Sequence, residues 1–263
     1  MRNDVISGGM TYEKDSKLPK IAAAFWVMKI SATTLGETAG DLLSMTLNVG
    51  YAFSSLILLS GFFISLVAQL LSKRYYPALY WTVILTTSTA GTTMSDYMDR
   101  TLGLGYTKGA AILITILLCV FTAWRLTMGT LAVDQVKTRK AELFYWIAIL
   151  FSNTLGTALG DFLADSSGLG FLGGALLIGG LLALVLLAAF LTQLSRVLLF
   201  WIAFVLTRPF GATVGDVLTK SKDKGGLNLG TIGSSAILAG ILVIFVAWSM
   251  MKDRRARAVS GSA

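Results

Sequence analysis

The sequence predicts an all-α integral membrane protein. Eight transmembrane helices would come from four parallel two-helix repeats, duplicated as two halves. Three observations predict this fold class. Hydrophobic residues make up 55% of the 263 residues and charged residues only 14%, whereas about a quarter of a soluble domain is charged. Apolar runs long enough to cross a bilayer follow one another along the chain, and one residue pattern occurs four times.

The repeated pattern begins with an aromatic residue followed by tryptophan. A glycine comes ten residues after the tryptophan, a small residue comes four residues later, and an aspartate follows it directly. The four copies are TLGETAGD (34–41), TAGTTMSD (89–96), TLGTALGD (154–161) and PFGATVGD (209–216). Successive copies are 55, 65 and 55 residues apart, so two copies form a half and the half recurs at an offset of 120 residues.

Each repeat contains two of the predicted helices. These span residues 20–45, 50–72, 77–98, 106–127, 141–165, 170–193, 196–218 and 230–250. The predicted organisation is an N-terminal tail (1–19), a first half (20–130), a linker (131–140), a second half (141–251) and a basic C-terminal tail (252–263). Because two crossings return the chain to the same side, all four repeats enter the membrane in one direction.

Lysine and arginine predict the orientation. Fifteen of them fall on the side of the termini and five on the other side, which indicates that both termini are cytoplasmic. The polar N-terminal tail has no apolar core of a cleavable signal. We expect a bacterial inner membrane. The basic balance is then explained by topology and by contact with the lipid bilayer, and not by nucleic acid.

The small residues of the motif predict close helix packing. Small residues four apart on a helix let two backbones approach each other in a membrane. The predicted packing positions are Gly36, Gly40, Gly91, Ser95, Gly156, Gly160, Gly211 and Gly215.

The same motif predicts a cation site. Thr34, Glu37, Thr38 and Asp41 share one helix face, and the other copies repeat the stripe in part. The motif aspartates lie about 20 residues, or roughly 30 Å, into their helices. Because the repeats are parallel, these carboxylates should lie at one depth and ring a common axis. The predicted ion-binding residues are Asp41, Asp96, Asp161, Asp216, Glu37, Thr38, Thr93 and Thr213, with the five acidic residues among them as metal ligands.

Other charged and aromatic residues have simpler predicted roles. Lys29 is either a charge partner for a buried acid or a side chain that reaches back to the cytoplasmic surface. Arg208 precedes a proline and is a candidate hinge. Asp99, Arg100 and Asp165 are expected to be solvated at the outer helix ends, and the tryptophans of the motif are expected to anchor the cytoplasmic interface.

The four-fold pattern of aromatic–Trp, Gly-x-x-x-Gly/Ser and Asp resembles a bacterial multi-pass membrane family. That family is built from a two-helix "repeat of unknown function", and its members are labelled uncharacterised membrane-anchored proteins. The likeness covers nearly the whole chain from about residue 20. The fourth copy departs at Pro209 and Ala212, so its role need not equal that of the others. The resemblance implies the fold and does not imply a substrate.

The sequence favours transport of a cation, exchanged for protons. A hard divalent metal ion of the manganese or magnesium class would suit a site with oxygen ligands alone. An organic-cation transporter, a cation channel and a structural assembly protein remain alternatives, and a homo-oligomer remains open. An enzyme is not predicted, because there is no histidine, only one cysteine (Cys119), no nucleophile–base pair and no cofactor fingerprint.

Overall fold

The computed structural model describes residues 18, 19 and 21–260, and that part of the chain consists of helices and turns without a strand. Its eight long helices are α1 (Ala23–Asp41), α2 (Tyr51–Leu71), α3 (Pro77–Asp96), α4 (Gly105–Met128), α5 (Arg139–Asp161), α6 (Gly170–Leu191), α7 (Arg196–Thr219) and α8 (Thr231–Ser260). Each overlaps most of one of the eight predicted segments. Most of the predicted N-terminal tail lies outside the described residues.

The last helix is longer than the sequence predicted. α8 continues through Lys252 and Arg254 to Ser260, where a cytoplasmic tail was expected from residue 252. Lysine, arginine and alanine have high helix propensity, so this polar segment extends the helix that precedes it. The last residues of the predicted tail, 261–263, lie outside the described part.

The odd-numbered helices form a closed inner ring. α1 packs against α3, α3 against α5, α5 against α7, and α7 against α1. The even-numbered helices form an outer layer, in which α2 packs on α3, α4 on α5, α6 on α7, and α8 on α1. The second helix of each repeat therefore packs on the first helix of the next repeat, and the second helix of the fourth repeat packs on the first helix of the first repeat.

Glycines of the motif set the spacing of the inner ring. A Cβ atom on Gly36 would lie 2.5 Å from the Ser88 Cβ, and one on Gly211 would lie 2.8 Å from the Thr33 Cβ. Gly91 meets the backbone of Asn153 and Gly156 meets the side chain of Arg208 in the same way. Each glycine thus receives the side chain that lies three residues before the next repeat's glycine.

The C-terminal ends of the inner helices share one construction. After the motif aspartates, π-helical turns extend three of them, namely η1 (Leu42–Thr46), η2 (Tyr97–Thr101) and η4 (Phe162–Ser166). Links with left-handed glycines such as Gly50, at φ 80°, then lead into the next helix. The fourth link is longer and contains the short 3-10 helix η5 (Lys222–Lys224).

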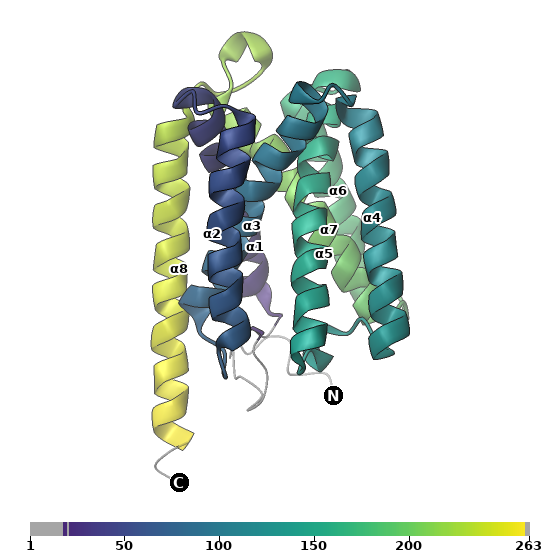
Figure 1. The fold of residues 1–263 in the computed structure, drawn as a ribbon, viewed down its shortest axis with the longest axis vertical. Helices are drawn as coiled ribbons and strands as arrows, with labels where there is room; N and C mark the ends of the chain where they lie inside the picture. The colour runs from purple at the N-terminus through teal and green to yellow at the C-terminus, as the bar shows by residue number, and fades with distance from the viewer. Residues whose placement is uncertain (1–17, 20, 261–263) are drawn as a thin grey trace.

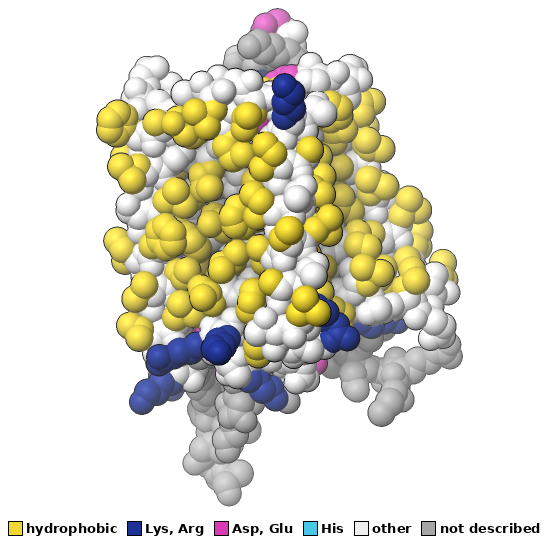
Figure 2. All heavy atoms as spheres, turned by 45° about the vertical axis from the view of Figure 1, so that its right-hand side comes forward, with side chains coloured by type: hydrophobic (Ala, Val, Ile, Leu, Met, Phe, Trp, Pro, Cys, Tyr) yellow, Lys and Arg dark blue, Asp and Glu magenta, His cyan; other side chains and the backbone are white. Residues whose placement is uncertain are grey.

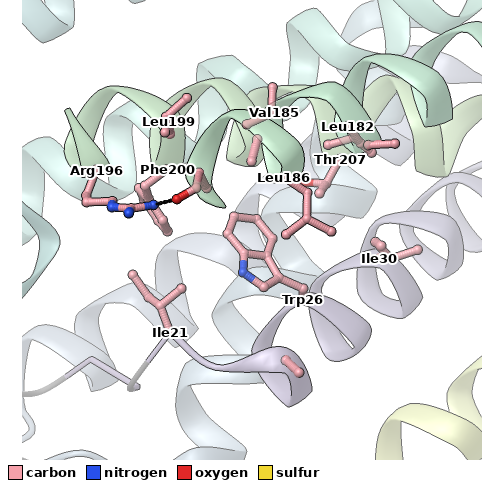
Figure 3. A pocket seen from close by; sticks show the side chains of 14 residues that line it. Ile21, Trp26, Ile30, Leu182, Val185, Leu186, Arg196, Leu199, Phe200 and Thr207 are labelled. Atoms are coloured by element: carbon pink, nitrogen blue, oxygen red, sulfur yellow. Dashed lines mark hydrogen bonds between the residues drawn. The ribbon is translucent and has the colours of Figure 1, made fainter. Parts of the chain in front are cut away.

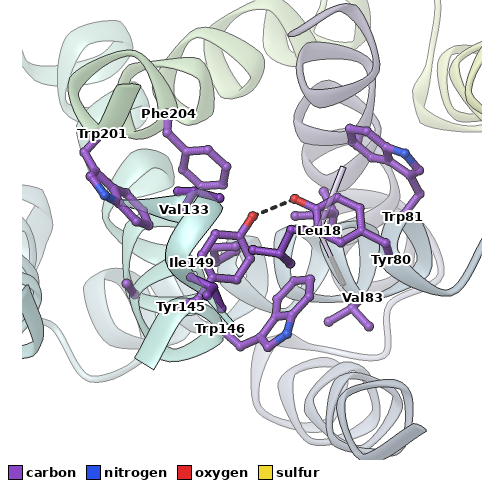
Figure 4. Close-up of a cluster of buried hydrophobic side chains, with 14 of the residues drawn as sticks. Leu18, Tyr80, Trp81, Val83, Val133, Tyr145, Trp146, Ile149, Trp201 and Phe204 are labelled. Atoms are coloured by element: carbon purple, nitrogen blue, oxygen red, sulfur yellow. Dashed lines mark hydrogen bonds between the residues drawn. The ribbon is translucent and has the colours of Figure 1, made fainter. Parts of the chain in front are cut away.

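An aromatic layer fills the opposite end of the ring, near the start of α1 and the end of α8. Trp81, Trp146 and Trp201 are 5% exposed or less, and Tyr80 and Tyr145 share a hydrogen bond of 2.6 Å (Figure 4). The prediction that the motif tryptophans anchor an interface was wrong for these three. Their rings pack against aromatic rings of neighbouring inner helices, Trp81 on Phe25, Trp146 on Tyr80 and Trp201 on Tyr145, which buries large apolar area where the helices converge.

The outer surface is apolar around its middle. Large hydrophobic side chains are exposed on all four even-numbered helices, including Ile64, Leu126, Leu176 and Ile244. Figure 2 shows most lysine and arginine side chains of this face gathered below the apolar region, and acidic side chains together with a basic one at the top. Six of the helices (α2, α4, α5, α6, α7 and α8) are long and apolar enough to cross a membrane.

Candidate functional site

All four motif aspartates are buried near the C-terminal ends of the inner helices. Their exposed fractions are 3% for Asp41, 2% for Asp96, 4% for Asp161 and 2% for Asp216. They do not form a uniform ring of free carboxylates. In two repeats, a basic residue lies four positions after the aspartate and bridges that aspartate to the aspartate of another repeat. The four aspartates are thereby divided into two pairs.

The first pair is Asp41 and Asp216, from α1 and α7. The Lys220 Nζ atom lies 2.7 Å from the Asp41 Oδ2 and 3.1 Å from the Asp216 Oδ1. Lys220 is the first residue after α7, so the end of that helix places its ammonium group between the two carboxylates. We call these three residues the Lys220 clamp.

The second pair is Asp96 and Asp161, from α3 and α5. The Arg100 Nε atom lies 2.9 Å from the Asp96 Oδ1, and its Nη2 donates to the Asp161 Oδ2 at 3.1 Å. We call these residues the Arg100 clamp. The expectation that Arg100 is simply solvated was wrong, since its side chain is 33% exposed and holds two carboxylates.

The bridging bases keep their charge. Burial alone would lower the pKa of Lys220, but the carboxylates of Asp216 and Asp41 raise it above its usual value. The pKa of Arg100 is raised in the same way by Asp96 and Asp161, against the effect of burial. Each clamp therefore holds a permanent organic cation, an ammonium in one and a guanidinium in the other.

Beneath the clamps, the bundle axis contains a buried ion pair that the sequence analysis did not predict. Both terminal nitrogens of Arg208 lie 3.0 Å from the Glu37 Oε2, and the arginine side chain is 0% exposed. Arg208 also donates to the Thr157 hydroxyl at 2.7 Å and contacts Thr92. One side chain of α7 thus bonds to the three other inner helices. The hinge hypothesis for Arg208 remains untested, but its contacts make it a crosslink.

Lys29 lies one helical turn further from the clamps. It is fully buried, its Nζ donates to the Asn153 Oδ1 at 3.4 Å, and it lies 4.1 Å from the centre of the Phe204 ring. Neither predicted role fits, because it does not reach the surface and forms no ion pair with an acid among the described residues. Arg208, and not Lys29, is the partner of Glu37.

The predicted threonines lie on the buried faces but bond mainly within their own helices. Thr38 donates to the Leu35 carbonyl, and also bonds Ser235 of α8 at 2.9 Å. Thr93 and Thr213 donate to backbone carbonyls one turn earlier. The hydroxyls that reach the central charges are instead Thr92 and Thr157, which occupy the position of Glu37 in repeats two and three.

Three carboxylates come close enough to share a cation. Oxygens of Glu37, Asp41 and Asp216 lie within 4.8 Å of one another, and all three residues are buried. At an effective dielectric constant of about 20, two full charges at such a distance repel by about 3 kcal/mol. Lys220 offsets this repulsion from one side and Arg208 from the other. The remaining predicted ligands, Asp96 and Asp161, lie in the other clamp.

The fold and the site define a class of protein: a four-repeat helical bundle whose inner helices enclose a buried charge network. The model of the Repeat of Unknown Function (DUF347) matches the chain at residues 24–75, 79–130, 144–195 and 199–255. The chain therefore belongs to the family built from this repeat. No curated protein and no solved structure matches it significantly.

Proposed function

We propose that the protein crosses a bacterial inner membrane with all eight helices and transports a cation in exchange for protons. The apolar outer layer supports the placement, because the even-numbered helices would face lipid. α1 and α3 are not among the six apolar spans, but they belong to the inner ring, and α8 and α2 of the outer layer pack on them. The excess of lysine and arginine on the side of the termini favours cytoplasmic termini.

The observation that carries the transport proposal is the convergence of Glu37, Asp41 and Asp216 around Lys220. Acidic side chains inside a membrane protein mark ion pathways more often than they mark packing. A bound cation relieves the same repulsion that protons relieve, so the two compete for these oxygens. Lys220 then acts as a tethered cation that fills the site until a substrate cation displaces it.

A hard divalent ion of the manganese or magnesium class is our first candidate substrate. The site offers carboxylate and hydroxyl oxygens, which are the ligands that such ions prefer. Neither histidine nor cysteine competes, since the chain has no histidine and Cys119 is exposed on another part of the molecule.

An organic cation is the second candidate, and one observation favours it. The clamps already bind an ammonium and a guanidinium group through paired carboxylates. A free amine or guanidine would use the same contacts that Lys220 and Arg100 use. A channel is less well supported, because Arg208, Lys29 and the aromatic layer fill the axis below the clamps.

Flux into liposomes that contain the purified protein tests the proposal. The panel would contain Mn²⁺, Mg²⁺, ethylammonium and guanidinium, each with and without an imposed pH gradient. We expect uptake of one class that depends on the gradient and that Asp41→Asn abolishes. Asp134→Asn, at an exposed acid far along the chain, is the matched control. Absence of flux for every cation in the panel would contradict the proposal.

A further inference from the structure

An apolar groove lies between α1, α6 and α7, away from the charge network. Its volume is about 720 Å³ and it is open on one side. Figure 3 shows Trp26 projecting into it from α1, opposite Leu182 and Leu186 of α6, with Phe200 of α7 at one end. Almost every lining side chain is aliphatic or aromatic, so the occupant must present a narrow hydrocarbon surface.

The groove lies where a polar bridge of the first half has no counterpart. At the equivalent place in the first half, Gln69 of α2 donates to Glu142 of α5 at 3.0 Å and joins the two helices. The 120-residue offset places Ala189 at the position of Gln69, and Ala22 at the position of Glu142. Two alanines cannot span this gap, and no polar bridge joins α6 to α1 among the described residues.

A basic side chain lies at one end of the groove. Arg196, the first residue of α7, lines it and donates to the carbonyl of Ala189. On the other flank of α7 lies a second apolar groove of about 680 Å³, lined by residues of α4 and α7 and by Arg125. Arg125 lies near the end of α4 and Arg196 begins α7, so both belong to the side on which the sequence analysis counts the excess of lysine and arginine.

We infer that the groove between α1, α6 and α7 binds an anionic phospholipid of the cytoplasmic leaflet. One acyl chain would lie along Leu182, Leu186 and Ala203, and the headgroup phosphate would face the Arg196 guanidinium. Basic pockets between transmembrane helices on the cytoplasmic side suit such headgroups. This inference rests on the membrane placement proposed above and is independent of cation transport.

Charge complementarity selects a lipid over a second copy of the chain. The exposed part of α6 that a second copy would offer is a row of leucines with a phenylalanine, and it carries no acid for Arg196. An anionic phospholipid supplies both a hydrocarbon tail for the groove and a negative group for its rim. A zwitterionic lipid supplies the tail alone.

Native mass spectrometry of the full chain tests this inference. The protein is titrated with phosphatidylglycerol and, separately, with phosphatidylcholine of the same acyl chains. We expect tighter adducts with phosphatidylglycerol. Arg196→Gln should reduce that preference about fivefold, the effect of one arginine near an anionic surface. Ala203→Leu should fill the groove and remove the adduct for both lipids.

Lys73→Gln is the matched control, because Lys73 is an exposed base in the loop after α2 and lines neither groove. It should leave the preference unchanged. Equal binding of the two lipids, or the same loss of preference in Lys73→Gln and Arg196→Gln, would overturn the inference. So would a dimer that disappears in Ala203→Leu, since a second copy would then occupy the groove. Cation flux is measured in a separate experiment, so a failure to detect flux would not affect the interpretation of the lipid-binding result.

Discussion

In the two clamps, Lys220 lies between Asp41 and Asp216, and Arg100 lies between Asp161 and Asp96. The 120-residue offset relates each residue of one clamp to a residue of the other. The two clamps are therefore copies of one device. What lies beneath them differs. Glu37 lies beside the Lys220 clamp, whereas its equivalent near the Arg100 clamp is Thr157. Duplication has supplied the scaffold twice, but only one copy has a third carboxylate.

The same contrast holds one turn deeper. The offset pairs Ser88 with Arg208 and Thr33 with Asn153. Arg208 therefore appears in the half that lacks the glutamate, and the two unique charges meet on the axis at 3.0 Å. Asymmetry between the halves has produced an ion pair that fixes how they dock. We infer that the geometry shared by the four repeats supports the fold, and that residues found in one repeat only, such as Glu37 and Arg208, distinguish the chemistry of the two halves.

The largest expected effect comes from breaking the axial pair. Glu37→Gln should lower the free energy of unfolding by about 3–5 kcal/mol, because it leaves the Arg208 charge buried without its partner. Thermal unfolding in detergent would measure this. The double variant Glu37→Gln with Arg208→Met removes both charges and should recover most of the loss. A single variant as stable as the unchanged protein would show that the pair contributes little.

The next effect concerns the clamps directly. Removing Lys220 by Lys220→Gln should tighten binding of a divalent cation about tenfold or more, since a tethered competitor is lost while three carboxylates remain. Arg100→Gln should act more weakly, because that clamp has only two carboxylates. Isothermal titration with Mn²⁺ compares them. Equal changes for both variants would remove the distinction between the clamps.

Packing at the ring comes third. Gly156→Ala should destabilise the protein by about 1–3 kcal/mol, because the new Cβ would lie 2.5 Å from the Arg208 Cβ and 2.9 Å from the Pro209 Cδ. Gly61→Ala is the matched control. Gly61 also lies inside a helix, with nothing within 4 Å of the added atom, and alanine there should stabilise by roughly 1 kcal/mol. Chemical unfolding would show whether the two signs differ.

The smallest effect is expected in the aromatic layer. Tyr80→Phe removes one hydroxyl from the 2.6 Å bond with Tyr145 and leaves the rings packed. The loss should be about 1 kcal/mol, the usual net value of one hydrogen bond. Thermal unfolding with Tyr145→Phe and the double variant would check this. A double variant with twice the single effect would show that the hydroxyls do not depend on each other.

The parts of the molecule that repeat were predictable from the sequence. Because a glycine and an aspartate recur at the same place in four copies, the sequence predicted the helices, the closely packed glycines and the common position of Asp41 and its equivalents along the inner helices. The apolar runs also predicted the helical segments, since a bilayer requires about 20 residues for each crossing.

The parts that break the repeat were not predictable in the same way. Among the four repeats, only one has a charged residue at the position of Arg208, and only one has a charged residue at the position of Glu37. These two positions lie in adjacent layers along the bundle axis. That signal was present in the sequence, but the packing order of the inner helices was needed to interpret it. Trp81 and Trp146 were misjudged because an interface anchor and a core aromatic have the same spacing along a helix.

The central claim is tested most directly by the binding of Mn²⁺ to the purified chain in nanodiscs, measured by electron paramagnetic resonance. Two double variants are compared, Asp41→Asn with Asp216→Asn and Asp96→Asn with Asp161→Asn. The account predicts that the first pair abolishes binding and that the second leaves a measurable site. Equal loss in both variants, or binding unchanged by the first, would contradict it.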